Sequence, residues 1–214
     1  MGRRTTCNSH LRQIALAFSQ YTQDYSGRFP GESYNNGVDQ GWTTVIQPHL
    51  KSVALYQCPS EANAQITDIS LGRNDYSDYY YNTNLTYTIN GAGIQTRGLS
   101  QSRLKAPTET ILIGEGHNGR FDYTSLKTED SRGQVYDAAS ESYSMATSGE
   151  EPRRRHAGGG MYAFADGHVK WLKPEAVSSG CNTGWTADVP EWCDPGVAAR
   201  PGTLSGVSAT FAAY

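Results

Sequence analysis

The sequence predicts an α+β fold in which a long N-terminal amphipathic helix packs on an antiparallel β-sheet, with long loops and a disulfide-braced C-terminal region. Three observations predict this class: an apolar stripe at helical spacing near the start, a short apolar run in the middle, and a hairpin signal further on. The chain has 214 residues, 18% charged and 11% aromatic. This composition excludes a coiled coil and a disordered polyelectrolyte. We expect a single domain over residues 1–214, with a helix at 3–26, a head of helix, loops and sheet at 27–177, and an irregular extension at 178–214.

The predicted N-terminal helix carries one apolar stripe. Its members follow at intervals of four, three, four, three and four residues: Cys7, Leu11, Ile14, Phe18, Tyr21 and Tyr25. Gly27 and Pro30 end the helix. A single stripe does not stabilise a helix alone, so we expect it to pack on a sheet through Leu11, Ile14 and Phe18. A shorter helix is predicted over residues 41–52, and Pro48 inside it should kink it or divide it into two turns.

Strands are predicted at three further places. Residues 108–114 (TETILIG) form a short apolar run that is typical of a buried strand. A tyrosine-rich segment predicts a strand over 79–89, and an alternating tail predicts an edge strand over 207–211. Residues 115–155 show no sustained period and are expected to form loops.

The segment 161–172 (MYAFADGHVKWL) predicts a β-hairpin. Asp166-Gly167 between alternating runs is typical of a two-residue turn, which requires positive φ at both central positions. Such a turn would put four apolar side chains on one face of the sheet, against the long helix: Tyr162, Phe164, Val169 and Trp171.

The charge and the motifs exclude several function classes. A net charge of −3 argues against a nucleic-acid-binding protein, and no apolar run reaches the roughly 20 residues needed to span a bilayer. The one basic run, 153–155, is interpreted as a solvated loop. No GxSxG or HExxH motif occurs. We expect no enzyme, no catalytic residues, and structural roles for His156 and Asp166.

The four cysteines do not form a CxxC pair, which argues against a zinc ribbon. An even number in a chain rich in Tyr, Gly and Ser favours an oxidising compartment and two disulfides. Cys7 begins the helix stripe and Cys58 follows the second helix, so a Cys7–Cys58 bridge would fix that segment to the long helix. The second predicted bridge is Cys181–Cys193; the alternative is buried free thiols.

Four segments together resemble a known family. They are RRTTCNSHLRQIALAFSQYTQDYSGRFP, GWTTVIQPHLKS with YQCPSE, LKAPTETILIGEG, and RRRHAGGGMYAFADGHVKWL. They resemble the prepilin-type pseudopilin family, which is similar to type II secretion pseudopilins and type IV pilins. The last segment matches its C-terminal motif of His, nine residues, then Asp-Gly, here His156, Asp166 and Gly167. The resemblance implies a processed leader and an apolar membrane helix, and we expect these 214 residues to be a soluble head that lacks both.

The resemblance implies a structural subunit of a type II secretion or type IV pilus-like assembly in the bacterial cell envelope. Expected partners are other pilin-like subunits and secretion or pilus assembly components, and the membrane only through the missing N-terminal segment. The expected location is the periplasmic or extracellular side, anchored in the inner membrane or incorporated in a filament. The alternative is a surface adhesin or glycan-binding module, which the tyrosine and tryptophan content would serve.

A calcium site is the one cofactor that the sequence suggests. Asp188, Glu191 and Asp194 offer three carboxylates within seven residues, and calcium prefers oxygen ligands. Some pseudopilins of this kind hold calcium in a C-terminal loop. The alternative is a solvated acidic loop, and no other cofactor is expected.

Overall fold

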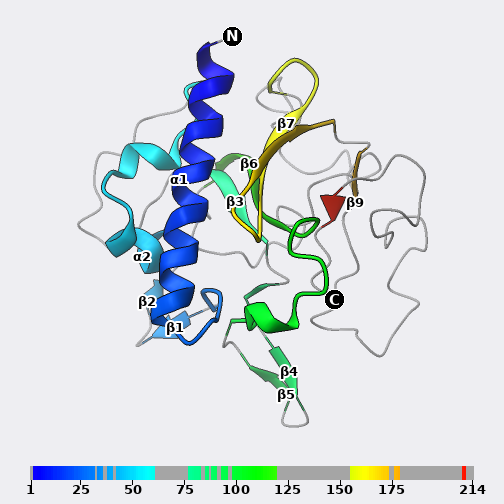
Figure 1. Cartoon of the computed structure of the whole chain (residues 1–214). Helices are drawn as coiled ribbons and strands as arrows, with labels where there is room; N and C mark the ends of the chain where they lie inside the picture. The colour runs from blue at the N-terminus through cyan, green and yellow to red at the C-terminus, as the bar shows by residue number, and fades with distance from the viewer. Residues whose placement is uncertain are drawn as a thin grey trace.

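The computed structural model has the predicted α+β architecture. It describes residues 2–31, 33–35, 38–40, 42–60, 77–82, 85–86, 88–90, 93–95, 98–119, 155–173, 176–178 and 209–210. Helix α1 (Gly2–Asp24) lies across one face of an antiparallel sheet with strand order β3-β6-β7-β8 (Figure 1). The sheet strands are β3 (Ser77–Tyr81), β6 (Ile111–Gly119), β7 (Gly160–Phe164) and β8 (Val169–Leu172).

Shorter elements surround helix α1 and the four-stranded sheet. Between α1 and the sheet strands the chain forms β1 (Ser33–Asn35), β2 (Val38–Gln40), α2 (Trp42–Ile46), and the 3₁₀ turns η1 (Gln47–His49) and η2 (Val53–Tyr56). The β4 (Thr88–Asn90) and β5 (Gly93–Gln95) hairpin and the turn η4 (Gln101–Arg103) precede β6. As predicted, the second helix is divided at Pro48, because proline donates no backbone hydrogen bond and fits the start of a turn.

The apolar face of α1 forms the main core with the sheet. Leu11, Ile14 and Phe18 are at most 1% exposed. The Phe18 ring lies 5.7 Å from the ring of Trp42 and 4.9 Å from that of Tyr81. The stripe ends earlier than predicted, because Tyr25 follows the last helical residue and is 55% exposed. No helix in the described part of the chain is long and apolar enough to cross a membrane.

Two strand predictions need correction. The strand predicted over 79–89 is wrong, because β3 ends at Tyr81 and the next strand belongs to a separate sheet. The chain turns at Asn82, whose side chain donates to the carbonyl of Ile111 and whose own carbonyl accepts from Leu85. The central strand β6 continues to Gly119, so the loop predicted from residue 115 begins later.

The predicted hairpin forms, but its register differs by one residue. Met161 pairs with Trp171 and Ala163 with Val169. The Gly167 amide donates to the carbonyl of Phe164, and Gly167 has φ +91°. The turn is therefore a three-residue loop that ends in a left-handed glycine, instead of the two-residue turn expected from Asp-Gly.

This shift moves two predicted core residues to the other face of the sheet. Val169 and Trp171 pack toward α1, as predicted, together with Met161 and Ala163. The placement of Tyr162 and Phe164 against α1 is wrong, because a one-residue slip on one strand reverses its side chains. Both belong to a second core, which they form with Ile111, Val177 and Ala209.

The second core also receives the C-terminal strands. β9 (Val177–Ser178) pairs in parallel with β10 (Ala209–Thr210), which lies within the predicted tail strand 207–211. The sheet is therefore covered by apolar side chains on both faces, with α1 on one and β9–β10 on the other.

The packing of α1 on the sheet can be tested with two apolar residues of the same helix. Phe18→Ala should lower the free energy of unfolding by about 3–5 kcal/mol, because it opens a cavity between Trp42 and Tyr81. Leu16 is 58% exposed, so Leu16→Ala should change it by no more than about 0.5 kcal/mol. Urea denaturation of both variants measures the difference; equal losses would contradict the assigned helix face.

Candidate functional site

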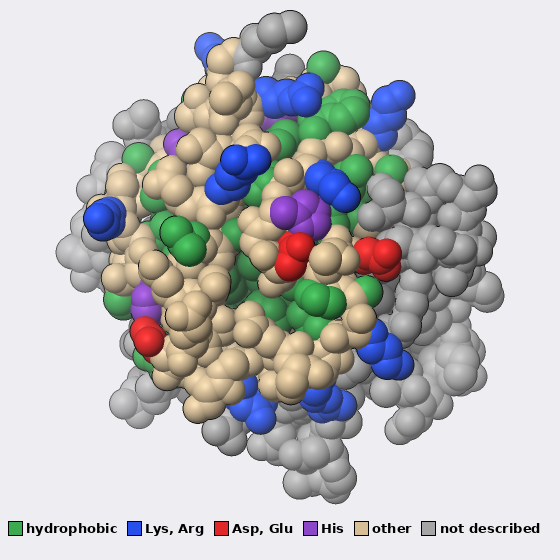
Figure 2. Space-filling view, viewed as in Figure 1, with side chains coloured by type: hydrophobic (Ala, Val, Ile, Leu, Met, Phe, Trp, Pro, Cys, Tyr) green, Lys and Arg blue, Asp and Glu red, His purple; other side chains and the backbone are tan. Residues whose placement is uncertain are grey.

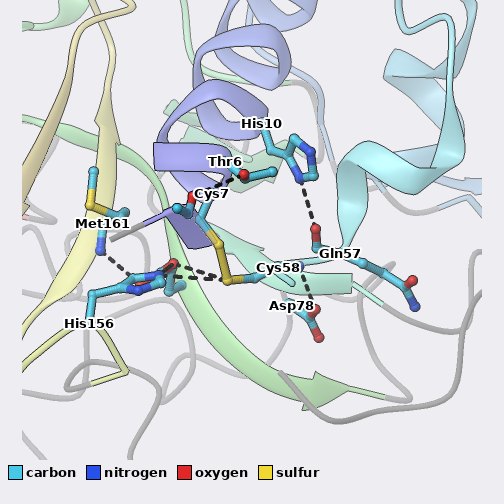
Figure 3. The surroundings of a disulfide bond; sticks show 10 residues. Thr6, Cys7, His10, Gln57, Cys58, Asp78, His156 and Met161 are labelled. Atoms are coloured by element: carbon cyan, nitrogen blue, oxygen red, sulfur yellow. Dashed lines mark hydrogen bonds and ion pairs between the residues drawn. A yellow bond between two sulfur atoms is a disulfide. The ribbon is translucent and has the colours of Figure 1, made fainter. Parts of the chain in front are cut away.

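Four buried side chains meet where the N-terminal part of α1 crosses the sheet. Cys7, Cys58, Glu115 and His156 each offer one donor atom, and these atoms lie within 4.8 Å of one another. They come from α1, from the segment after η2, from β6 and from the turn before β7 (Figure 3). We call these four residues the Cys–His–Glu cluster.

The predicted Cys7–Cys58 disulfide is confirmed and joins residues 51 positions apart. Its surroundings hold the η2 segment against α1. The His10 ring donates from Nδ1 to the carbonyl of Gln57 at 2.8 Å, and the Cys58 amide donates to a carboxylate oxygen of buried Asp78 at 2.6 Å. Cys181 and Cys193 lie outside the described residues, as do the calcium candidates Asp188, Glu191 and Asp194.

A buried ion pair lies directly against the disulfide. His156 Nε2 is 2.7 Å from Glu115 Oε1, and the two side chains are 3% and 0% exposed. Cys58 Sγ is 3.6 Å from His156 Nε2 and 3.7 Å from Glu115 Oε1. The other carboxylate oxygen, Oε2, accepts from the Met161 amide at 2.9 Å. One proton lies between Nε2 of the imidazole and Oε1 of the carboxyl group.

The glycine run before β7 places His156 in this position. Ala157 and Gly158 both have positive φ, and the His156 amide donates to the carbonyl of Gly159 at 2.9 Å. The indole of Trp171 donates to the carbonyl of His156 at 2.8 Å. A Cβ on Gly159 would lie 2.6 Å from atoms of the Trp171 ring. The tight turn at Ala157 and Gly158 and the close packing of Gly159 against Trp171 together orient the His156 imidazole toward β6.

Two carboxylates make the environment of the cluster negative. Tyr79 pairs in register with Glu115 on the neighbouring strand, so their side chains share a face. Burial, and then the charges of Glu115 and Asp78, raise the pKa of Tyr79 well above its usual range, while Arg155 opposes them. Within the described residues the Tyr79 hydroxyl has no hydrogen-bond partner. Tyr79 is therefore a neutral phenol at physiological pH.

The structure separates the residues of the C-terminal family motif. His156 belongs to the cluster, whereas Asp166 and Gly167 form the hairpin tip, where Asp166 pairs with the ring of His168. His156 and Asp166 thus contact different partners and do not form one acid–base pair.

Sequence reasoning missed Glu115, although a signal for it exists. In a strand, residues two apart share a face, so Glu115 continues the face of Ile113 into the core. A carboxylate at such a position needs a partner. Asp78 was also missed, because β3 begins at Ser77, whereas the predicted strand began at residue 79.

Comparison with known protein families gives a match over the start of the chain. Residues 1–57 match the model of a family described as a protein of unknown function (DUF1559), a family of bacterial proteins related to pilin-like and pseudopilin-like proteins. The match covers 57 of 214 residues, from α1 to the residue before Cys58. No curated protein and no solved structure matches the chain. The chain is thus similar to this family in its N-terminal quarter.

The ion pair can be tested with a double-mutant cycle. Glu115→Leu and His156→Leu should each lower the free energy of unfolding by about 3–5 kcal/mol, because each leaves a buried polar partner uncompensated. The double variant should lose about 1–3 kcal/mol less than the sum of the two. Chemical denaturation of the four proteins measures this coupling, and strictly additive losses would show that the two side chains do not interact.

Proposed function

We propose that this chain is the head of a structural, pseudopilin-like subunit in a type II secretion or type IV pilus-like assembly of the bacterial envelope. The observation that carries the proposal is the form of α1, a helix of 23 residues that packs on an antiparallel sheet and begins with exposed residues. The match of the first 57 residues to a family related to pilins supports the same assignment.

The start of α1 is suited to continuing an upstream helix. Residues 2–6 are all exposed although they are helical, and they project at one end of the molecule (Figure 1). The first side chain of the helix that is fully buried is Cys7. We propose that an apolar segment upstream continues α1 and anchors the head in the inner membrane or in a filament.

The outward face of α1 offers little surface for stable self-association. Arg12, Gln13, Gln20 and Gln23 are exposed. Figure 2 shows hydrophobic side chains on this face as separate small groups among polar atoms. Monomeric proteins tolerate such groups, whereas stable interfaces need larger continuous patches. We therefore propose that contacts with other pilin-like subunits draw most of their energy from the upstream segment.

Most of the large aromatic residues that the structure describes do not favour the adhesin alternative, Tyr25 being an exposed exception. Glycan-binding surfaces need exposed rings, but Trp42, Tyr56, Tyr79, Tyr81 and Tyr162 are at most 3% exposed. Their rings fill the two cores. We therefore also propose a non-enzymatic, structural role, with the head on the periplasmic or extracellular side.

Light scattering and membrane flotation test the proposal. These 214 residues should be monomeric or weakly dimeric at micromolar concentration. The same head carrying an apolar helix of about 20 residues that extends α1 upstream should bind membranes or polymerise. The control carries an upstream extension of equal length in which every third residue is lysine.

The decisive measurement is cysteine crosslinking in cells that express this protein from its own gene. Cysteines introduced at exposed Arg3 and Gln13 should form crosslinks between neighbouring subunits in intact envelopes. A large, stable oligomer of the head alone, or the absence of both membrane association and crosslinks, would contradict the proposal.

A further inference from the structure

We propose that the Cys7–Cys58 disulfide is the oxidised form of a metal centre, and that the reduced chain binds one zinc(II) ion through Cys7, Cys58, His156 and Glu115. The ligand atoms are the two sulfurs, Nε2 of the histidine and Oε1 of the glutamate. The inference is independent of the proposed function, because it rests on the Cys–His–Glu cluster alone.

The ligand set is chemically suited to zinc. Zinc takes thiolate, imidazole and carboxylate ligands, and its structural sites are four-coordinate and closed to water. All four residues are buried, the most exposed being His156 at 5%. Two thiolates among the donors disfavour calcium and magnesium, which take oxygen ligands.

The distances already resemble those between the ligands of a tetrahedral zinc ion. With Zn–S of about 2.3 Å and Zn–N or Zn–O of about 2.0–2.2 Å, a sulfur ligand lies about 3.6 Å from a nitrogen or oxygen ligand. Cys58 Sγ lies 3.6 Å from His156 Nε2 and 3.7 Å from Glu115 Oε1. Two of the distances between ligand atoms therefore already match those of a tetrahedral site.

Two distances must increase when the metal binds. The two sulfurs are bonded to each other and must separate to about 3.8 Å, which requires that the S–S bond be broken. The 2.7 Å contact between His156 and Glu115 must open to about 3.4 Å as the metal replaces the proton between them. Cys7 lies near the exposed start of α1, where a helix moves most easily.

Groups around the cluster would hold the ligands in place. The Met161 amide binds Glu115 Oε2 and leaves Oε1 for the metal, and the Cys58 amide is bound by Asp78. The His156 backbone is held on both sides, by Gly159 and by Trp171. Hydrogen bonds of this kind orient metal ligands and strengthen binding.

A disulfide with a purely structural role does not require a buried carboxylate and imidazole beside it. Burying a carboxylate and an imidazole carries a desolvation penalty that their attraction only partly offsets, and apolar side chains of similar size stabilise such a position as well or better. A cystine is itself apolar and packs well in a hydrophobic core. The buried Glu115–His156 pair against the sulfurs is therefore better explained by a second state in which all four residues bind one ion.

The conversion balances as two steps. A phosphine reductant and water convert the disulfide to two thiols and the phosphine oxide, a two-electron reduction. Zinc(II) then displaces the two thiol protons and the proton between His156 Nε2 and Glu115 Oε1, which is either released or carried by Nδ1. The bound site has two thiolates, one carboxylate and a neutral imidazole around one dication.

The test compares oxidised and reduced forms of the untagged full chain. The protein is reduced with tris(2-carboxyethyl)phosphine in urea, refolded without oxygen, and titrated with zinc(II) and with cobalt(II). The reduced chain should bind one equivalent of zinc, and cobalt should give the visible bands of a tetrahedral thiolate site. The oxidised chain should bind neither metal at this site. Circular dichroism at each stage reports whether the chain is folded.

Variants distinguish this site from other metal-binding residues. Cys7→Ser with Cys58→Ser, and His156→Ala, should weaken zinc binding by at least 100-fold, and Glu115→Gln by at least tenfold. Two controls should bind zinc as the unaltered chain does: His168→Ala, which removes a partly exposed histidine at the hairpin tip, and Cys181→Ser with Cys193→Ser. His156→Cys should keep one equivalent of metal and intensify the sulfur-to-cobalt charge-transfer band, a result that a merely structural histidine does not predict.

The outcomes decide the proposal. Binding of one equivalent that is lost in the Cys7/Cys58 variant and kept in both controls supports it, as does a reduced chain that folds only when zinc is added. A reduced chain that folds without binding metal overturns it. A reduced chain that neither folds nor binds zinc overturns it too, as does binding that survives Cys7→Ser with Cys58→Ser.

Discussion

The packing of α1 on the four-stranded sheet is the contact on which the rest of the structure depends. A helix with one apolar face is marginal in water, and a sheet with two apolar faces needs a cover on each. Leu11, Ile14 and Phe18 bury the apolar face of the helix and cover one face of the sheet, because they pack above Tyr81 and its neighbouring strands, while β9 and β10 cover the other face. The α2–η2 segment then closes the side of this interface, and the Cys7–Cys58 bridge ties it to the helix.

The polarity of this interface changes along the helix. Around Phe18 it is aromatic and apolar, whereas around Cys7 it contains a buried carboxylate and imidazole. Three strands of the sheet each contribute one element of the polar end: Asp78 from β3, Glu115 from β6 and the Met161 amide from β7. A shift of any strand by one residue would break these contacts, so the polar end also fixes the register of the sheet.

Redox state connects the two proposals. In an oxidising envelope compartment the cluster holds a disulfide, which stabilises the head by restricting its unfolded chain. In a reducing compartment the same residues would present two thiolates beside a histidine and a glutamate. A zinc ion there would take over the crosslink between α1 and the η2 segment, so the head would keep the same fold in both compartments.

The sequence by itself determined the long helix, the central strand, the hairpin and the Cys7–Cys58 pairing, because each depends on local spacing or on the order of adjacent elements. Tertiary structure alone decided the hairpin register and the cluster. Asp166-Gly167 permits both a two-residue and a three-residue turn, and only pairing across the sheet selects between them. Glu115 and His156 are 41 residues apart. No local pattern in the sequence predicts that β6 and the glycine turn before β7 bring both side chains against the sulfur of Cys58.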